Sequence, residues 1–384
     1  MKKMQTKLLY ALNFTVFLSI SIVNTQMLPL LKKLDYNVVE RGYILAGSAI
    51  IAILGQFLFG YLCDRFKKTK PFFYLAYLCL LIASIMMFLK SGKLFFYHFS
   101  AASIILGMVK VIMGLTETWM LEIQEDSYGK LRACGALGFT LGSPLTGMLV
   151  KMLGYRSLLY GFCIIGGLAL VLIYVVNDKN KKNTQPFHKN DIAKLIKNKD
   201  YCLLVCIFLF IYMIGTADQY VVVDKLLSLD ASNTQIGIKW AVQSFMEIPL
   251  FLGANWILKK WNIYQLLVFG TGMYILKFVL YGYFSEPLLL ILTSALQLVT
   301  LPIIMLTSKL FIKAVTPQQL FHSAQMFAMA VFVGGSGLIT PIITSYVANR
   351  VGYDLTLYLT AAFGILPLVL IGYYHHRQNS DKKG

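Results

Sequence analysis

Residues 157–177 read SLLYGFCIIGGLALVLIYVVN and contain no acidic or basic side chain. A helix needs about 20 mostly apolar residues to cross the hydrocarbon core of a bilayer, which is roughly 30 Å thick. An open strand of the same composition would leave its backbone N–H and C=O groups unpaired in lipid. This stretch therefore predicts a membrane-spanning α-helix.

The composition of the whole chain agrees with a membrane location. Of its 384 residues, 58% are apolar and 14% are charged, whereas an ordinary soluble domain is roughly 45–50% apolar and about 25% charged. The excess apolar surface must face lipid, because a soluble fold lacks the polar groups to cover it. A secreted disulfide scaffold, a disordered chain and a cytosolic enzyme are excluded.

Apolar runs of similar length recur along the chain, separated by short polar segments. They are too long for the strands of a membrane barrel, which have about 10 residues and alternate with period two. We therefore expect an all-α membrane protein with twelve transmembrane helices. The expected spans are residues 8–31, 42–63, 71–90, 95–121, 128–151 and 157–177, and then residues 201–223, 236–257, 264–284, 287–309, 322–347 and 355–374.

One long polar break divides these spans into two sets of six. It covers residues 177–200 and contains seven lysines before Asp200. This layout is typical of transporters that are built from two parallel six-helix repeats. The sequence predicts an N-terminal six-helix bundle over residues 1–176, a basic cytoplasmic linker over residues 177–200, and a C-terminal six-helix bundle with a short cytoplasmic tail over residues 201–384.

The basic residues predict the orientation of the chain. There are 35 Lys and Arg against 17 Asp and Glu, a net charge of +18. Cytoplasmic loops are enriched in Lys and Arg. Counting places 23 bases on the side that holds both termini and 10 on the other, Arg41, Lys225 and Lys239 among the ten. We expect a protein of the cytoplasmic membrane with both termini in the cytoplasm, and no nucleic-acid partner.

Six charged side chains of the expected spans form a short list of candidates for the interior, where an unpaired charge is costly. Three acids and three bases would permit a paired interior. Each is a candidate for a substrate or proton site, with a structural ion pair as the alternative, and a lysine also has the option of extending toward the membrane surface. They are Lys110, Glu117, Arg132, Asp218, Glu247 and Lys277. Lys110 and Glu117 are seven residues apart, so they share a helix face about 10 Å apart along the axis.

The segment GYLCDRFKKTK, residues 60–70, joins the second and third expected spans. It resembles the signature loop of the major facilitator superfamily, G-x-x-x-D-R/K-x-G-x-R/K, with Lys67 where that family usually has Gly. The resemblance implies two pseudo-symmetric six-helix bundles. It also implies a gating loop in which Asp64 latches the two halves, together with Gly60, Arg65 and Lys68.

Residues 128–139, YGKLRACGALGF, resemble the start of the fifth helix in the lactose permease branch of that superfamily, which includes nucleoside and phenylpropionate permeases. In lactose permeases a fourth-helix Glu and a fifth-helix Arg bind sugar hydroxyls together. Glu117 and Arg132 match them, and a carboxylate with a guanidinium fork offers matched acceptors and donors to a polyol. Phe139 stands where the family has the Trp that stacks on the sugar ring.

The second half resembles the same branch in part. Asp218 and Glu247 match acids of helices seven and eight, and Lys277 stands in for an Arg of helix nine. In helix ten, the family's His and proton-carrying Glu fall on Gln297 and Thr300. Any proton would then be carried by Asp218, Glu247 or Glu117, since a buried carboxylate suits that task. The resemblance makes Gln297 a substrate-binding candidate.

The hypothesis that follows is a secondary transporter that moves a small polar solute by alternating access. A sugar or oligosaccharide is the first choice of solute, taken up with H⁺; a nucleoside or aromatic-acid permease, a uniporter and an efflux carrier remain alternatives. A membrane-embedded transferase or a sensor is the hypothesis from another class, but no catalytic motif supports an enzyme. No cofactor, metal or catalytic residue is expected, and the functional unit is expected to be a monomer in the lipid bilayer.

Overall fold

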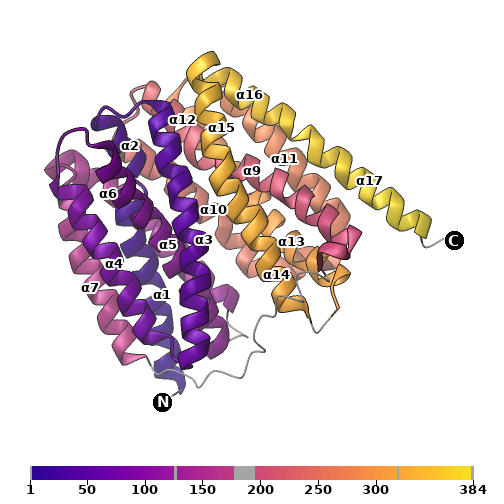
Figure 1. Ribbon diagram of the computed structural model, residues 1–384, viewed down its shortest axis with the longest axis horizontal. Coiled ribbons are helices and arrows are strands. Elements are labelled where there is room, and N and C mark those ends of the chain that lie inside the picture. The colour runs from indigo at the N-terminus through magenta and orange to yellow at the C-terminus, as the bar shows by residue number, and fades with distance from the viewer. Residues whose placement is uncertain (1, 125–127, 177–194, 318–319, 382–384) are drawn as a thin grey trace.

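The computed structural model describes residues 2–124, 128–176, 195–317 and 320–381, and every regular element in those ranges is a helix (Figure 1). The helices form two bundles that lie side by side, one from each half of the chain. Most of the linker predicted over residues 177–200 lies outside the described residues. The predicted all-α class with two six-helix bundles is confirmed.

The first bundle contains six spans. Its first span is split into two helices by a short turn at Thr25 and Gln26. The elements are α1 (Lys2–Asn24), α2 (Met27–Lys33), α3 (Val38–Phe66), α4 (Lys70–Leu89), α5 (Phe95–Gln124), α6 (Tyr128–Leu153) and α7 (Ser157–Val175).

The second bundle also contains six spans, and its last three are interrupted. Three continuous helices come first: α9 (Lys199–Ser228), α10 (Asn233–Lys260) and α11 (Ile263–Tyr283). The remaining elements are α12 (Pro287–Thr293), the 3₁₀ segment η2 (Ser294–Val299) and α13 (Leu301–Val315); α14 (Phe321–Met329), the π segment η4 (Ala330–Gly335) and α15 (Ser336–Val351); α16 (Tyr353–Phe363) and α17 (Ile365–Asp381).

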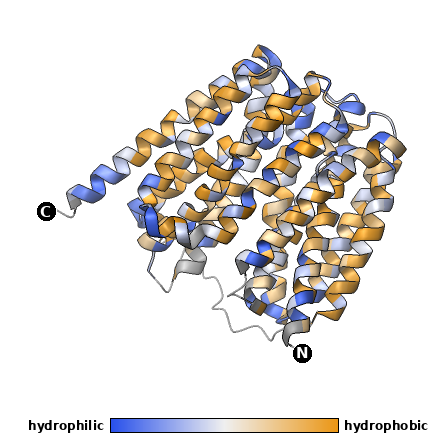
Figure 2. Ribbon diagram, turned by 180° about the vertical axis from the view of Figure 1, so that it is seen from behind, coloured by the Kyte–Doolittle hydropathy of each residue, from blue (hydrophilic) through white to orange (hydrophobic). Residues whose placement is uncertain are grey.

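Each of the twelve predicted spans falls on one of these helical segments. Within the described chain, eleven segments are long and apolar enough to cross a membrane. The remaining span, α10, has 28 residues but is more polar, because Lys239, Gln243 and Glu247 lie along it. Figure 2 shows apolar residues along the lengths of the helices and polar ones gathered mainly toward their ends.

The tenth and eleventh spans are each interrupted by a segment that is not α-helical. The tenth changes to a 3₁₀ segment and breaks at Thr300, where φ is −115° and ψ is −100°. Pro302 is the second residue of α13, and proline fits the first turn of a helix because the N–H it lacks has no partner there. The eleventh contains a π segment that ends at Gly335. Such interruptions inside helices are frequent at functional sites.

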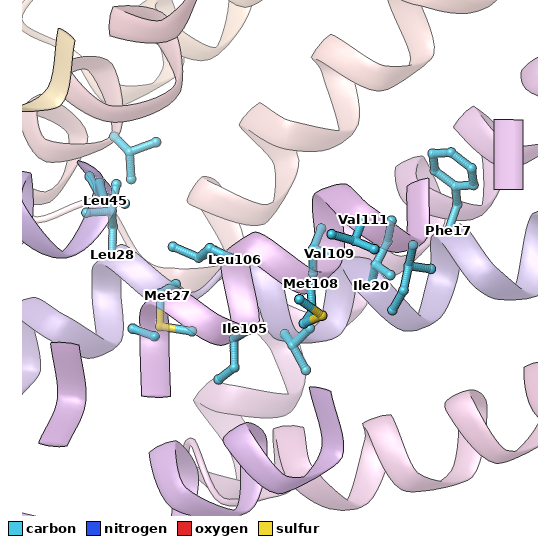
Figure 3. Packing of buried hydrophobic residues seen from close by; sticks show 14 of the residues in the cluster. Phe17, Ile20, Met27, Leu28, Leu45, Ile105, Leu106, Met108, Val109 and Val111 are labelled. Atoms are coloured by element: carbon cyan, nitrogen blue, oxygen red, sulfur yellow. The ribbon is translucent and has the colours of Figure 1, made fainter. Parts of the chain in front are cut away.

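The core of the first bundle is apolar and closely packed. Figure 3 shows Phe17, Ile20, Leu45, Ile105 and Val109 among its members, and each is at most 3% exposed. They come from α1, α3 and α5, so these three helices hold the bundle together. Its polar side chains are therefore positioned by a rigid apolar frame.

The two bundles meet along α6 and α10, which run antiparallel and approach at glycines. A Cβ added to Gly147 would lie less than 3.0 Å from the carbonyl oxygen of Asn233, and one added to Gly237 would lie equally close to that of Ser143. Small residues allow helix backbones to come this close. The α6–α10 seam therefore depends on having glycine, which has no side chain, at these two positions.

Five other glycines, on α6 and on the η4–α15 segment, divide into two groups. Gly135, Gly138 and Gly142 face Phe17, Phe14 and Ser21 of α1, inside the first bundle. Gly334 and Gly337 face Ile53 and Ala49 of α3, across the boundary between the bundles. Static packing therefore accounts for the first group, whereas the second lies where the bundles would move against each other.

Gly237→Val is expected to lower the thermal unfolding midpoint of the purified protein. Overpacking of this kind typically costs about 1–3 kcal/mol, because the added side chain forces a backbone shift. The matched control is Gly253→Val on the same helix, where an added Cβ meets nothing within 4 Å. Equal midpoints for the two variants would contradict the close α6–α10 seam.

Candidate functional site

A buried ion cluster surrounds Asp218 in the second bundle. Lys277 of α11 places its ammonium 2.5 Å from one carboxylate oxygen, and Gln243 of α10 donates to the same oxygen at 2.8 Å. Tyr281 donates to the other oxygen at 3.1 Å. Lys239 lies 3.5 Å from that oxygen and donates to the backbone carbonyl of Asp218 at 3.0 Å. Asp218 is thus the common acceptor that ties α9, α10 and α11 together.

A hydrogen-bonded path leads from this cluster to Glu247. Lys277 donates to the side-chain oxygen of Gln297 at 2.8 Å, and the Gln297 amide donates to Glu247 at 3.2 Å. Gln297 lies in η2, so the helix interruption places this amide between a lysine and a carboxylate. The residues expected from sequence at Asp218, Glu247, Lys277 and Gln297 therefore form one connected group.

Glu117 and Arg132 form an ion pair at the edge of the first bundle. The guanidinium Nε lies 3.0 Å from a Glu117 carboxylate oxygen. The guanidinium carbon lies 4.7 Å from the ring centre of Phe17 and 4.9 Å from that of Phe251, distances at which a cation is attracted to an aromatic ring. Phe251 belongs to α10, so Arg132 is clamped between the two bundles.

The group that ends at Glu247 and the Glu117–Arg132 pair meet at the boundary between the two bundles. Glu247 is one helical turn before Phe251 on α10, and its carboxylate interacts electrostatically with both Arg132 and Glu117. Tyr212 of α9 also interacts electrostatically with Glu117. The geometry thus brings acceptors and donors from both bundles to one place, which is where a solute between the bundles would contact them.

Phe139 lies farther along the same seam and packs edge-on against Trp240, with ring centres 6.5 Å apart. The indole N–H of Trp240 is buried and has no hydrogen-bond partner within the described residues. The Phe139 ring is therefore paired with a second aromatic residue across the boundary between the bundles.

Lys110 stands apart from both groups. Its ammonium lies 3.7 Å from the position that a Cβ on Gly337 would take, so it reaches toward α15. In the described part of the chain it forms no ion pair with an acid. Lys110 and Glu117 therefore share a helix face, as the spacing predicts, but only Glu117 has an opposite charge beside it.

The predicted gating loop lies at the end of α3. Arg65 donates to the Tyr61 hydroxyl at 3.2 Å and lies over the rings of Tyr61 and Phe66. Lys67 has a φ of 52°, a left-handed conformation that favours glycine. Gly60, Asp64 and Lys68 flank it, and the latching role of Asp64 stays a prediction.

Sequence reasoning missed three buried bases, because it counted them with the residues of the outer loops. Lys239 is fully buried against Asp218, Arg41 pairs with Asp224 at 2.8 Å, and Lys225 pairs with Asp354 at 2.7 Å. Lys239 lies inside the predicted span 236–257, and that position was the available signal. The acids Asp224 and Asp354 flank predicted span ends, so their pairing with these bases could not be read from the sequence.

Contacts between the bundles also gather at one end of the molecule, which is uppermost in Figure 1 and which we term the upper side. This end holds the connections that follow Lys33, Leu153, Ser228 and Val351. They include an ion pair, a tyrosine pair and hydrogen bonds to backbone. Burial raises the pKa of the Tyr155 phenol to about 12, so it stays a donor. The contacts are Arg41–Asp224, Tyr43–Tyr346, Lys32 to the Leu227 carbonyl, Gln26 to the Asn233 carbonyl, and Tyr155 to the Asn233 side chain.

Within the described residues, no three His, Cys, Asp or Glu side chains gather as a metal site would require. The charged groups of the interior are ammonium, guanidinium and carboxylate groups that face one another. Such a set suits recognition of a polar solute by hydrogen bonds and charge.

Asp218→Asn is expected to destabilise the protein more than Lys239→Met does. The first change leaves two buried ammonium groups without their carboxylate, and breaking a buried pair costs about 3–5 kcal/mol. The second removes one ammonium and leaves Asp218 paired with Lys277. Thermal unfolding midpoints in detergent should fall in the order wild type, Lys239→Met, Asp218→Asn. The reverse order of the two variants would show that Asp218 is not the centre of the cluster.

Comparison with known proteins agrees with this arrangement. The model of the MFS_1 like family matches residues 6–354. The chain is 23% identical over 369 residues to "Uncharacterized transporter YwbF" of Bacillus subtilis (strain 168), covering 94% of this chain and 90% of that one. It is 24% identical over 317 residues to "Putative nucleoside transporter YegT" of Escherichia coli (strain K12), covering 72% and 70%.

Among solved structures, the fold is similar to that of the nucleoside transporter NupG. The TM-score is 0.77 at 16% identity, and the match covers 97% of this chain and 98% of that one. The likeness extends over both bundles and agrees with the family match. The chain belongs to the MFS_1 like family and is thus a membrane transporter of the major facilitator superfamily.

Proposed function

We propose that the protein takes up a small hydroxylated solute, a sugar or oligosaccharide, across the cytoplasmic membrane by alternating access. The observation that carries the proposal is the Glu117–Arg132 pair, 3.0 Å apart and held at the boundary between the bundles. A carboxylate accepts hydrogen bonds from hydroxyl groups and a guanidinium fork donates to them. Glu247 and Gln297 add an acceptor and an amide from the opposite bundle, so the solute is bound from both sides.

A nucleoside is the second candidate solute. Two proteins to which the chain is similar carry nucleoside transport in their names. A ribose ring offers hydroxyl groups to the same pair, and the Phe139–Trp240 pair offers aromatic faces to a base. The sugar and nucleoside hypotheses therefore share the Glu117–Arg132 site and differ in what lies beyond it.

Alternating access assigns a role to the contacts at the upper side. We take this side to be external and the side with both termini to be cytoplasmic, as the basic residues predict. The Arg41–Asp224 and Tyr43–Tyr346 contacts then close the external side, and their release would open it. The α6–α10 seam and the Gly334 and Gly337 contacts supply the surfaces along which one bundle rocks against the other.

Proton coupling is proposed to run through Glu247. Asp218 accepts hydrogen bonds from Lys277, Gln243 and Tyr281, and protonation would sacrifice several of these. Among the described residues, Glu247 accepts one hydrogen bond, from Gln297. Since it also interacts electrostatically with Arg132, its charge is coupled to the solute pair. The functional unit is proposed to be a monomer.

Glu117→Gln and Arg132→Ala should each reduce uptake of the transported solute at least tenfold while folded protein is retained. Each change removes the charge-assisted hydrogen bonds that the partner cannot replace. Uptake into proteoliposomes measures the effect, with Glu40→Gln as the control, because Glu40 pairs with Lys93 at 2.7 Å on the surface. Normal uptake in both site variants would overturn the assignment of the pair.

Glu247→Gln should abolish the stimulation of uptake by an inward proton gradient and leave solute exchange intact. The amide keeps the hydrogen-bonding shape of the acid but cannot change its charge. Initial rates in vesicles with and without an imposed pH gradient give the first quantity, and counterflow gives the second. Persistent gradient stimulation in this variant would contradict a proton-carrying role for Glu247.

A further inference from the structure

We infer that Lys110 binds a carboxylate on the transported solute, which makes the solute a sugar acid rather than a neutral sugar. This inference rests on the proposed function, because it places the acid on the same solute that Glu117 and Arg132 bind. It is carried by the charge balance of the interior, by the depth of Lys110 and by the face on which its ammonium lies.

The basic groups of the interior outnumber its carboxylates by one, which leaves one ammonium without an acid beside it. Besides the Arg41–Asp224 and Lys225–Asp354 pairs, the described residues place three carboxylates and four basic groups in the interior. Asp218 is shared by two lysines, Glu117 is paired with Arg132, and Glu247 interacts electrostatically with Arg132 and Lys277. The fourth base is Lys110, which has no acid beside it in that part of the chain. An isolated charge inside a membrane is costly unless something pairs with it.

Lys110 lies too far from both ends of its helix for its ammonium to reach the membrane surface. Its helix, α5, spans Phe95–Gln124, and residue 110 is at its middle. At 1.5 Å per residue, each end is roughly 20 Å away, which is far beyond the four-carbon stem of a lysine. The ammonium must therefore be solvated or paired within the protein.

The ammonium lies on the face of α5 that is turned to the other bundle. Its Nζ is 3.7 Å from where a Cβ on Gly337 of α15 would be. Lys110, Gly114, Glu117 and Thr118 form a partly or fully exposed stripe at helical spacing, whereas Val111 and Ile112 beside it are at most 1% exposed. The free charge and the Glu117 carboxylate therefore lie along one accessible strip between the bundles.

The spacing along this strip fits one sugar ring with an acid group. Lys110 and Glu117 are about 10 Å apart along the helix axis. A hydroxylated ring that hydrogen-bonds to Glu117 and Arg132 directs a terminal carboxylate along the strip toward Lys110. Binding then pairs the remaining ammonium, and because the interaction is charge-assisted it favours the acid over the neutral sugar of the same shape.

The test is a thermal-shift titration of the purified, full-length protein with matched pairs of solutes: D-glucuronate against D-glucose, and D-galacturonate against D-galactose. A ligand that binds the folded state raises the unfolding midpoint in proportion to its affinity. We expect at least one acid to bind about tenfold more tightly than its neutral partner. Lys110→Met should remove that preference, and Lys110→Arg, which keeps the charge, should retain it.

The outcomes separate this inference from the proposed function. Equal stabilisation by acid and neutral sugar in the wild type, or an acid preference that survives in Lys110→Met, overturns the inference and leaves the sugar site standing. Stabilisation by nucleosides alone, with no response to any sugar or sugar acid, overturns both. If Lys110→Met does not fold, Lys110→Gln takes its place, and an acid preference that survives in Lys110→Gln overturns the inference.

Discussion

The ion cluster around the Asp218 carboxylate is the interaction on which the interior of the second bundle depends. This carboxylate is buried and is approached by two ammonium groups, an amide and a phenol from α10 and α11. Because lipid offers no alternative partners, these groups must satisfy one another. That requirement fixes Lys277, which in turn holds Gln297, and Gln297 reaches Glu247 at the boundary between the bundles.

The same constraint explains how the two bundles meet. Apolar helix faces that point to lipid give no specificity between helices, so the contacts rely on glycines and on paired polar groups. Gly147 and Gly237 allow α6 and α10 to touch, and Arg41–Asp224 joins the bundles at the upper side. A polar contact such as Arg41–Asp224 can be broken and remade, which suits a protein that alternates between states.

Much of the fold and part of the site could be predicted from the sequence. Span positions follow from hydropathy alone, and the Glu117–Arg132 pair follows from the family resemblance. The position of Lys239 inside the predicted span 236–257 was a signal of its burial, but its pairing with Asp218 could not be predicted, because the pairing of a charge depends on which helices pack together. The breaks in the tenth and eleventh spans were missed for a related reason: Pro302 and Gly335 permit an interruption, but packing decides whether one forms.

The central claim is that a solute binds between the bundles at Glu117 and Arg132. Its most direct test is a cryo-electron microscopy map of the protein with the solute that stabilises it most. The account predicts density that contacts the carboxylate of Glu117 and the guanidinium of Arg132 and extends along α5. Solute density elsewhere, with the Glu117–Arg132 pair unchanged and uncontacted, would contradict it.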